Sequence, residues 1–378
     1  MKRIIFYLLP IVLFSYCTKD TEETDSSPEP VKESMRKIDG PYIMYEDENI
    51  VNYKTNAKGE LETALLTTDD VLEVYVANKT PDYFEFKLMK AFSEGPVITK
   101  DGEPILAISD IEGNYHAFTK LLIGNGVTNE NLNWTYGKKH LVLVGDMVDR
   151  GTNVTQVLWL IYKLEKEALA AGGQVHFILG NHDIMCMAGD DRYAASKYLI
   201  MARLMNVSYK DLYGTNAEFG RWMRTKHVIE KIDDYIFVHG GISPDVLQLN
   251  LSIQEMNDKV RPYYGLEVTQ SAPADVYQLS KTSGLFWYRG YVKGKDDAYE
   301  KASQQEVTAI LDRYQAKAII VGHCVVDQIE AEYNGGVVTV DVEQADSENS
   351  RRACQALLIE DGKMFRVNEN GERIALKK

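Results

Sequence analysis

The chain has 378 residues, of which 45% are apolar and 26% charged, so it can bury a core and wholesale disorder is excluded. Its net charge is -14, from 42 basic and 56 acidic residues, which argues against general nucleic-acid binding because such binding needs a basic face. A phosphorylated substrate stays open, since bound metal ions can reverse the local field.

The N-terminus has the layout of a signal peptide. Lys2 and Arg3 precede an apolar run over residues 4–14, which is shorter than the roughly 20 residues that span a bilayer. Cys17 follows this run, as in the lipidation site of bacterial lipoproteins, although Tyr16 stands where a small residue is usual. We expect residues 1–17 to be a signal peptide and lipobox, and the chain to be an exported, membrane-anchored lipoprotein of the periplasm or cell surface. Plain cleavage and secretion is the alternative.

Two further segments precede the main domain. Residues 18–40 are dominated by Asp, Glu, Ser, Pro and Lys, which predicts a disordered linker. Residues 41–98 contain short alternating segments, separated by turn-like stretches at 56–59 and 78–81, which predict a small antiparallel β subdomain.

From residue 99 to residue 378 the sequence predicts one α/β domain. Five short apolar runs each end in polar residues that can bind metal, and helical patterns such as 154–171 separate several of them. The runs and the polar residues that follow them are 105–108 with Asp110, 140–144 with Asp146, 175–179 with Asn181 and His182, 235–238 with His239, and 318–321 with His323. Because ligands bind beyond the carboxyl ends of strands in α/β sheets, we expect these side chains to share one crevice.

The segments between and after these runs complete the expected domain. Residues 184–230 and 251–316 have helical patterns, and the first is expected to form a cap over the site. Residues 328–333, 336–340, 356–359 and 364–367 are expected to be strands joined by hairpin turns.

Five sequence blocks occur in the order found in one known family. The blocks are Asp110-Ile111-Glu112-Gly113-Asn114, Gly145-Asp146-Met147-Val148-Asp149-Arg150-Gly151, Gly180-Asn181-His182-Asp183, His239-Gly240-Gly241 and Gly322-His323. They resemble the calcineurin-like metallophosphoesterases, and within them the phosphoprotein-phosphatase branch, with bacterial Shewanella-like phosphatases as the nearest group. The resemblance implies a β-sandwich flanked by helices.

The resemblance also implies a site for two divalent metal ions. Hard divalent metals bind carboxylate, amide oxygen and imidazole ligands. Asp146 would bridge the two ions, Asp110 and Glu112 would complete the first ion's ligands, and the second ion's ligands would be Asn181, His239 and His323. A water shared by the ions would become the nucleophile, because metal binding lowers its pKa.

Four further residues take catalytic roles by the same resemblance. His182 would protonate the leaving alkoxide, and Asp149 would orient it. Arg150 would hold phosphate oxygens in two-point contacts, and Arg289 resembles a second phosphate clamp.

Glu112 departs from the family, which usually has His at this position. A carboxylate there favours harder ions, so Mn²⁺ is the expected metal, with Mg²⁺, Fe and Zn²⁺ as alternatives. The departure could instead indicate a degraded first metal site.

The leading prediction is a metal-dependent phosphomonoesterase that acts on a phosphoprotein or a small phosphoester. The alternatives are a dinucleoside polyphosphate hydrolase and a surface binding lipoprotein with a relic site. The expected partners are the phosphorylated substrate and, through the lipid anchor alone, a membrane; no nucleic acid is expected.

Overall fold

The fold comes from a computed structural model that describes residues 39–378, apart from 78–80, 296–297, 347–349, 351 and 378. The predicted signal peptide, the lipidation site at Cys17 and nearly all of the predicted linker lie outside the described residues. Among the described helices, none combines the length and apolar character that crossing a membrane requires.

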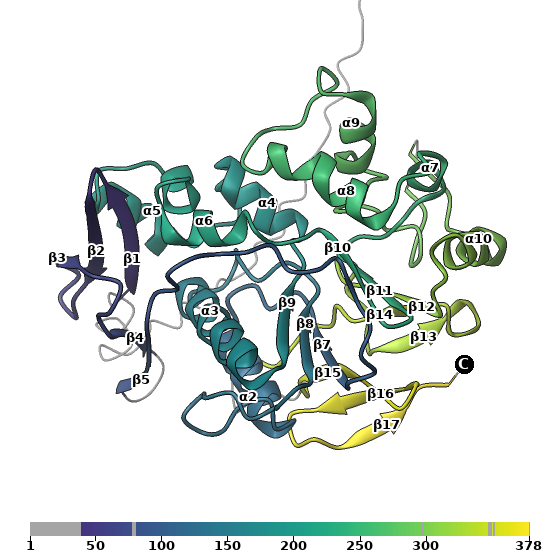
Figure 1. The fold of residues 1–378 in the computed structure, drawn as a ribbon, viewed down its shortest axis with the longest axis horizontal. Helices are drawn as coiled ribbons and strands as arrows, with labels where there is room; N and C mark the ends of the chain where they lie inside the picture. The colour runs from purple at the N-terminus through teal and green to yellow at the C-terminus, as the bar shows by residue number, and fades with distance from the viewer. Residues whose placement is uncertain (1–38, 78–80, 296–297, 347–349, 351, 378) are drawn as a thin grey trace, which may run out of the picture.

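Two six-stranded mixed sheets form the centre of the main domain (Figure 1). The strands of the first sheet, in spatial order, are β13 (Glu330–Glu332), β14 (Val337–Thr339), β12 (Ala318–Val321), β11 (Tyr235–Val238), β10 (Ile229–Ile232) and β6 (Ile98–Thr99). The strands of the second sheet are β17 (Arg373–Ala375), β16 (Lys363–Asn368), β15 (Gln355–Glu360), β7 (Ile105–Ile108), β8 (His140–Leu143) and β9 (Gln174–Phe177). Strands β7, β8 and β9 run parallel, as do β11, β12 and β14.

The central strands are apolar on both faces because both faces are buried. In β7, Ile105 and Ala107 belong to an apolar cluster that also contains Phe237 and Ile320 of the first sheet, which fills the space between the sheets. Leu106 and Ile108 alternate with them and belong to the larger cluster on the other face. Such strands read as continuous apolar runs rather than as alternating patterns.

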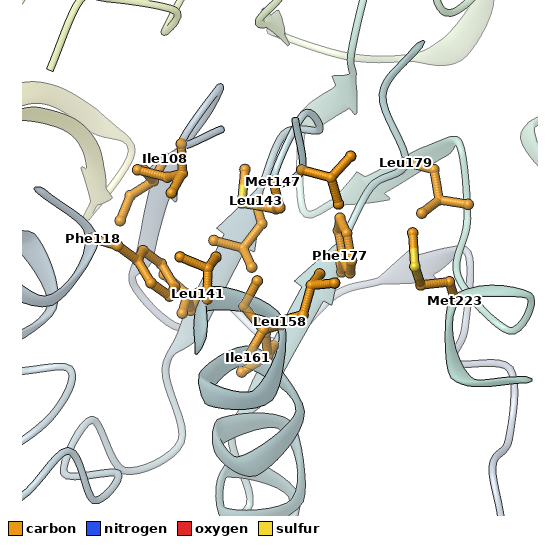
Figure 2. Packing of buried hydrophobic residues seen from close by; sticks show 14 of the residues in the cluster. Ile108, Phe118, Leu141, Leu143, Met147, Leu158, Ile161, Phe177, Leu179 and Met223 are labelled. Atoms are coloured by element: carbon orange, nitrogen blue, oxygen red, sulfur yellow. The ribbon is translucent and has the colours of Figure 1, made fainter. Parts of the chain in front are cut away.

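Two helices cover the outer face of the second sheet. Helix α2 (Tyr115–Gly124) contributes Phe118 to the packing, and α3 (Val154–Ala171) contributes Leu158 and Ile161. Figure 2 shows these side chains against Leu141 and Leu143 of β8. Because every one of these side chains is fully buried, the layer holds the β7 and β8 ends, and the loops that follow them, in fixed positions.

The remaining helices belong to the segments of the chain that connect the strands. They are α4 (Asn181–Ala188), α5 (Ser196–Leu204), η1 (Tyr209–Tyr213), α6 (Glu218–Met223), α7 (Pro244–Gln248), α8 (Ile253–Val260), η2 (Arg261–Tyr263), α9 (Ala274–Ser280), α10 (Gln304–Tyr314) and η3 (Tyr333–Gly335). The segment with the predicted helical pattern at 184–230 contains α4, α5 and α6, but its last two residues already belong to β10.

The N-terminal β unit packs against α3. It comprises a three-stranded antiparallel sheet and a hairpin, which are β1 (Asp39–Glu46), β2 (Asn49–Thr55) and β3 (Leu61–Leu66), then β4 (Leu72–Ala77) and β5 (Pro81–Phe86). The Trp159 indole of α3 donates a hydrogen bond to the Pro41 carbonyl at 2.8 Å, and its ring lies 4.3 Å from that of Phe86. An aromatic contact with a satisfied indole N–H fixes the unit on the main domain.

A chain of polar side chains links β8, β9 and β10, and its members other than Asp101 are buried. Asp101 contacts His140 Nε2 at 3.0 Å, His140 Nδ1 lies 3.0 Å from His176 Nε2, and His176 Nδ1 lies 2.6 Å from Glu230 Oε2. His227 Nδ1 contacts the other Glu230 oxygen at 2.9 Å. These contacts join the three strands, and we therefore assign these histidines a structural role.

We expect the change Glu230→Gln to lower the free energy of unfolding by about 3–5 kcal/mol at pH 7, because it removes the charged partner of two buried imidazoles. Burial alone would raise the Glu230 pKa, but His176 and His227 hold the pKa at about 2. A depressed carboxylate pKa stabilises the fold above the unfolded value of 4.5 and loses that effect as the pH falls towards 2. Urea unfolding at pH 7 and pH 4 should therefore show a smaller difference between wild type and variant at pH 4. An equal difference at both pH values would contradict this prediction.

Candidate active site

The carboxyl ends of the parallel strands meet along one edge. In the second sheet Ile108 is level with Leu143, so Asp110 and Asp146 follow neighbouring strands. In the first sheet Phe237 is level with Ile320, which places His239 beside the Gly322–His323 turn. The loops are joined by backbone hydrogen bonds from Asp110 N to Gly145 O and from Glu112 N to Asp146 O, each 3.0 Å long. The predicted convergence of strand ends is therefore present in the structure.

Glycines before the site residues permit this close approach. A Cβ atom on Gly145, whose φ is +90°, would collide with His239 Nδ1 and lie 2.8 Å from the Gly180 backbone. A Cβ atom on Gly322 would lie 2.5 Å from the Asp110 carboxylate. The recurring glycine directly before Asp146 and His323 is thus a packing requirement of the site.

One group of donors gathers around His239, which is fully buried. Its Nε2 lies 2.9 Å from Asn181 Oδ1 and 3.1 Å from Asp146 Oδ2, while its Nδ1 donates to the Val144 carbonyl at 2.7 Å. The backbone hydrogen bond fixes the ring so that Nε2 faces the other donors. His323 completes the group, with its ring 5.1 Å from that of His239. Two imidazoles, an amide oxygen and a carboxylate fit a divalent transition metal.

A second group of donors consists of carboxylates. Asp110 Oδ2 accepts hydrogen bonds from Ser109 Oγ and, at 3.2 Å, from the His323 backbone N–H. Glu112, Asp146 and His182 each offer one potential ligand atom, and these three atoms lie within 4.8 Å of one another. Glu112 also forms an ion pair with Arg150. Carboxylate oxygens fit a hard divalent cation, so the residues present suit the two predicted ions.

The protonation states of these groups reflect the crowding of negative charge. Burial, reinforced by the Asp146 charge, raises the pKa of Asp110 to about 7. Burial also acts to raise the pKa of Asp146, but the neighbouring His239 outweighs it and lowers that pKa to about 2. Burial favours neutral His239, yet Asp146 and Asp110 raise its pKa to about 10. The site therefore has a strong negative field, which favours cations.

His182 is held for proton transfer at one nitrogen. Its Nδ1 lies 2.7 Å from Asp149 Oδ2, and its backbone N–H donates to Asp146 Oδ1 at 2.9 Å. The ring lies against Tyr193, with centroids 5.0 Å apart. Because Asp149 engages Nδ1, proton transfer in the cavity that His182 lines falls to Nε2, which lies 4.0 Å from Asp146 Oδ2.

A cavity of about 750 Å³ opens over the site. Most of the predicted site residues line it, namely Asp110, Glu112, Asp146, Arg150, His182, Arg289 and His323. His239 and Asp149 contact the lining residues Asp146 and His182, and Asn181 contacts His239. Arg289 Nη1 donates to the His323 carbonyl at 2.6 Å, which leaves the rest of its guanidinium available to an anion. All ten residues predicted outside the N-terminus therefore come together at one place.

Two positioning residues were missed by the sequence reasoning. The fully buried Asp183 carboxylate accepts backbone hydrogen bonds from Gly180, Asp146 and Met147 at 2.8–3.2 Å, so it fixes the loops that carry Asp146 and Asn181. The sequence does indicate Asp183, because this residue ends the block 180–183 that also contains Asn181 and His182. Ser109, directly before Asp110, holds that carboxylate and also donates to the Val144 carbonyl.

The site also stores backbone strain. Six of its residues have a positive φ, from 48° to 69°, a region that non-glycine residues adopt rarely. They are Asp110, Glu112, Asp146, Asp149, Arg150 and His323. Such strain costs about 1–3 kcal/mol per residue and is typical of sites whose side chains are held in place in advance.

Comparison with known families identifies the fold and the chemistry. The profile described as Calcineurin-like phosphoesterase matches residues 103–327, which is more than half of the chain. The chain belongs to this family. The calcineurin-like chain is therefore a metal-dependent phosphoesterase, and the phosphatases among its relatives identify it as a phosphatase enzyme.

Individual relatives agree with this assignment. A solved structure of a cold-active protein-tyrosine phosphatase from a psychrophilic Shewanella species is 30% identical, covers 90% of this chain and 99% of its own, and has a TM-score of 0.79. The Shewanella-like protein phosphatase 1 of Plasmodium berghei is 30% identical over 58% of this chain, and the match spans 60% of that relative's length. The Shewanella-like protein phosphatase 2 of Arabidopsis thaliana is 24% identical, over 64% of this chain and 71% of its own. The mixed α/β fold with a small N-terminal sheet is thereby confirmed.

We expect Glu112→Gln to lower metal occupancy and turnover strongly, because it removes a charged oxygen from the carboxylate group of donors. Metal content after dialysis and turnover at several Mn²⁺ concentrations measure both effects. Glu112→His is the matched control, since it restores the donor usual in the family and should keep metal bound. Near-normal activity of Glu112→Gln would refute the ligand role.

Proposed function

We propose that the chain is an exported, Mn²⁺-dependent protein phosphatase with a two-metal site. The observation that carries this proposal is the His182–Asp149 pair, which stands directly beside the donors around Asp146. A positioned acid next to a cation site suits phosphomonoester hydrolysis, since a proton stabilises the leaving phenolate of phosphotyrosine or the leaving alkoxide of phosphoserine. The six ligands and the bridging role of Asp146 are part of the proposal.

Each group of site residues has a separate role in the proposed hydrolysis. Two divalent cations, when bound, supply a water of lowered pKa and neutralise charge on the phosphoryl group. His182 transfers its proton to the leaving oxygen, and Asp149 keeps its ring oriented through Nδ1. Arg150 and Arg289, on the wall of the cavity, hold phosphoryl oxygens. The ion pair of Arg150 with Glu112 keeps this guanidinium at the cavity before substrate arrives.

The proposed substrate is a phosphorylated protein, with phosphotyrosine foremost. The protein-tyrosine phosphatase of the Shewanella species aligns with this chain over 99% of its own length. A second cavity of about 460 Å³ adjoins the site at Asn181 and Trp287, and its wall includes Met185, Tyr264 and Phe286. An apolar cavity beside the phosphoryl position suits residues that flank a phosphotyrosine. We propose that α4 and the segment after it contribute to this selection.

Hydrolysis of dinucleoside polyphosphates is the second candidate. The symmetrical bis(5'-nucleosyl)-tetraphosphatase of Methylococcus capsulatus is 27% identical over 37% of this chain and 44% of its own length. That match covers less of both proteins than the match to the Shewanella phosphatase does.

Export and lipidation at Cys17 remain proposals from the N-terminal sequence. They rest on the basic start, the short apolar run and the position of the cysteine. Labelling of expressed cells with a radioactive fatty acid, with Cys17→Ser as the control, should mark the wild type alone.

A panel of metals and substrates tests the activity. The protein lacking residues 1–17 is assayed with p-nitrophenyl phosphate, phosphotyrosine and phosphoserine peptides and diadenosine tetraphosphate, each with Mn²⁺, Mg²⁺, Zn²⁺ or Fe²⁺. We expect turnover of the phosphotyrosine peptide with Mn²⁺ to have the highest kcat/KM. Preference for diadenosine tetraphosphate would favour the second candidate, and no turnover with any metal would favour a relic site.

A further inference from the structure

Strand β14 also ends in a carboxylate, which none of the five sequence blocks contains. Strands β12 and β14 are parallel neighbours with Val321 level with Thr339. Val340 N donates to the Val321 carbonyl at 2.8 Å, so the two chains leave their strands together. They pair again further on, where Val326 N donates to the Asp341 carbonyl at 2.9 Å. Asp341 thus follows β14 at the same edge of the sheet where His323 follows β12.

The Asp341 side chain is buried and faces the site. Asp341 is only 4% exposed, and it lines the same cavity as Asp110 and Asp146. Within the described part of the chain, its carboxylate has no hydrogen-bond or ion-pair partner, in contrast to the carboxylates of Asp149 and Asp183. The carboxylate oxygens remain accessible from the cavity, so a cation or water bound there can serve as their partner.

The nearest guanidinium does not meet this need. Arg289 directs Nη1 to the His323 carbonyl at 2.6 Å and to Cys324 Sγ at 3.5 Å, and no ion pair joins it to Asp341 among the described residues. The acidic neighbours Asp110 and Asp146 make the need for positive charge greater. A cation or its hydration shell, rather than a protein side chain, is the partner that this arrangement fits.

We propose that Asp341 is a positioning residue for the first divalent cation, where it accepts hydrogen bonds from water molecules that the cation retains. Hard cations such as Mg²⁺ keep several waters when carboxylates bind them. This inference rests on the two-metal site of the proposed function.

The two cation positions then differ in chemical character. Around the first position every proposed contact is a carboxylate oxygen, whereas the second has two imidazoles and an amide. Carboxylate and water favour Mn²⁺ and Mg²⁺, while imidazole suits Zn²⁺ and Fe as well. The first position therefore holds the hard cation, and Asp341 is one of the residues that select it.

The test is Mn²⁺ binding to the purified Asp341→Asn variant, followed through the electron paramagnetic resonance signal of free Mn²⁺. Wild type should bind two ions, and the variant should bind one of them about 10–100-fold more weakly, as for other residues that act through a metal's outer contacts. The second affinity should not change. Glu343→Gln is the matched control, because Glu343 lines the same cavity but is exposed and paired with Arg352.

Thermal unfolding separates a role in cation binding from a role in folding. Without metal, Asp341→Asn should unfold at the wild-type temperature or above, because the amide replaces a carboxyl group that has no hydrogen-bond or ion-pair partner among the described residues. With Mn²⁺, its midpoint should rise less than that of wild type. Two unchanged affinities, loss of both ions, or a lower midpoint without metal would overturn the proposal. Because these measurements use no substrate, two bound ions without phosphatase activity would count against the proposed function alone.

Discussion

Replacing His182 by glutamine should lower kcat for a phosphoserine peptide by about 10²–10⁴-fold, the usual contribution of a positioned general acid. A serine alkoxide is a poor leaving group and needs the proton that His182 supplies. The same change should have a much smaller effect on p-nitrophenyl phosphate, because nitrophenolate leaves without protonation. Steady-state kinetics on both substrates at saturating Mn²⁺ measure the difference.

Asp149→Asn is the companion variant for this prediction. It keeps the imidazole but replaces the carboxylate that lies 2.7 Å from His182 Nδ1. We expect a loss in the same direction, again larger for the phosphoserine peptide. Equal losses on the two substrates in the His182 variant would show that the histidine acts in binding or in metal retention rather than in proton donation.

Asp146→Asn should be the most damaging single change to the metal site. Its carboxylate touches both groups of donors, through His239 at 3.1 Å and through the set that contains Glu112. Two bound cations are worth several kcal/mol to the transition state, so turnover should fall by about 10³-fold or more. Excess Mn²⁺ should not restore turnover in this variant. In Glu112→Gln, by contrast, we expect excess Mn²⁺ to restore part of the turnover.

The Asp146 variant needs two checks. Metal analysis after dialysis should find fewer than one ion per chain, and circular dichroism should show an unchanged fold. Glu343→Gln, which removes a carboxylate from the exposed rim of the same cavity, should keep both metal and activity. A variant that keeps two ions would exclude the bridging role of Asp146.

The strand ends of the site could be predicted because the sequence pattern that marks each of them is local. The runs before Asp110, Asp146 and His239 are apolar throughout, since both of their faces are buried, and a serine precedes Asp110 and a glycine precedes Asp146. Local patterns of this kind place the side chains at one edge of a sheet without any knowledge of the order of strands.

Residues whose roles depend on register were missed. Val340 and Asp341 look like an ordinary strand end, and only the pairing of β12 with β14 places Asp341 at the same edge of the sheet as His323. The strand pattern of β10 was likewise hidden, because Ile229–Ile232 follows a helical segment and includes the buried Glu230. Pairing between distant segments is a tertiary property that no local pattern contains.

The central claim is that two cations share Asp146, and anomalous diffraction from Mn²⁺-soaked crystals tests it most directly. We predict two anomalous peaks about 3.5–4 Å apart. One should lie beside Asp110 and Glu112, the other beside Asn181, His239 and His323, with the Asp146 carboxylate between them. A single peak, or peaks that do not contact Asp146, would contradict the two-metal site.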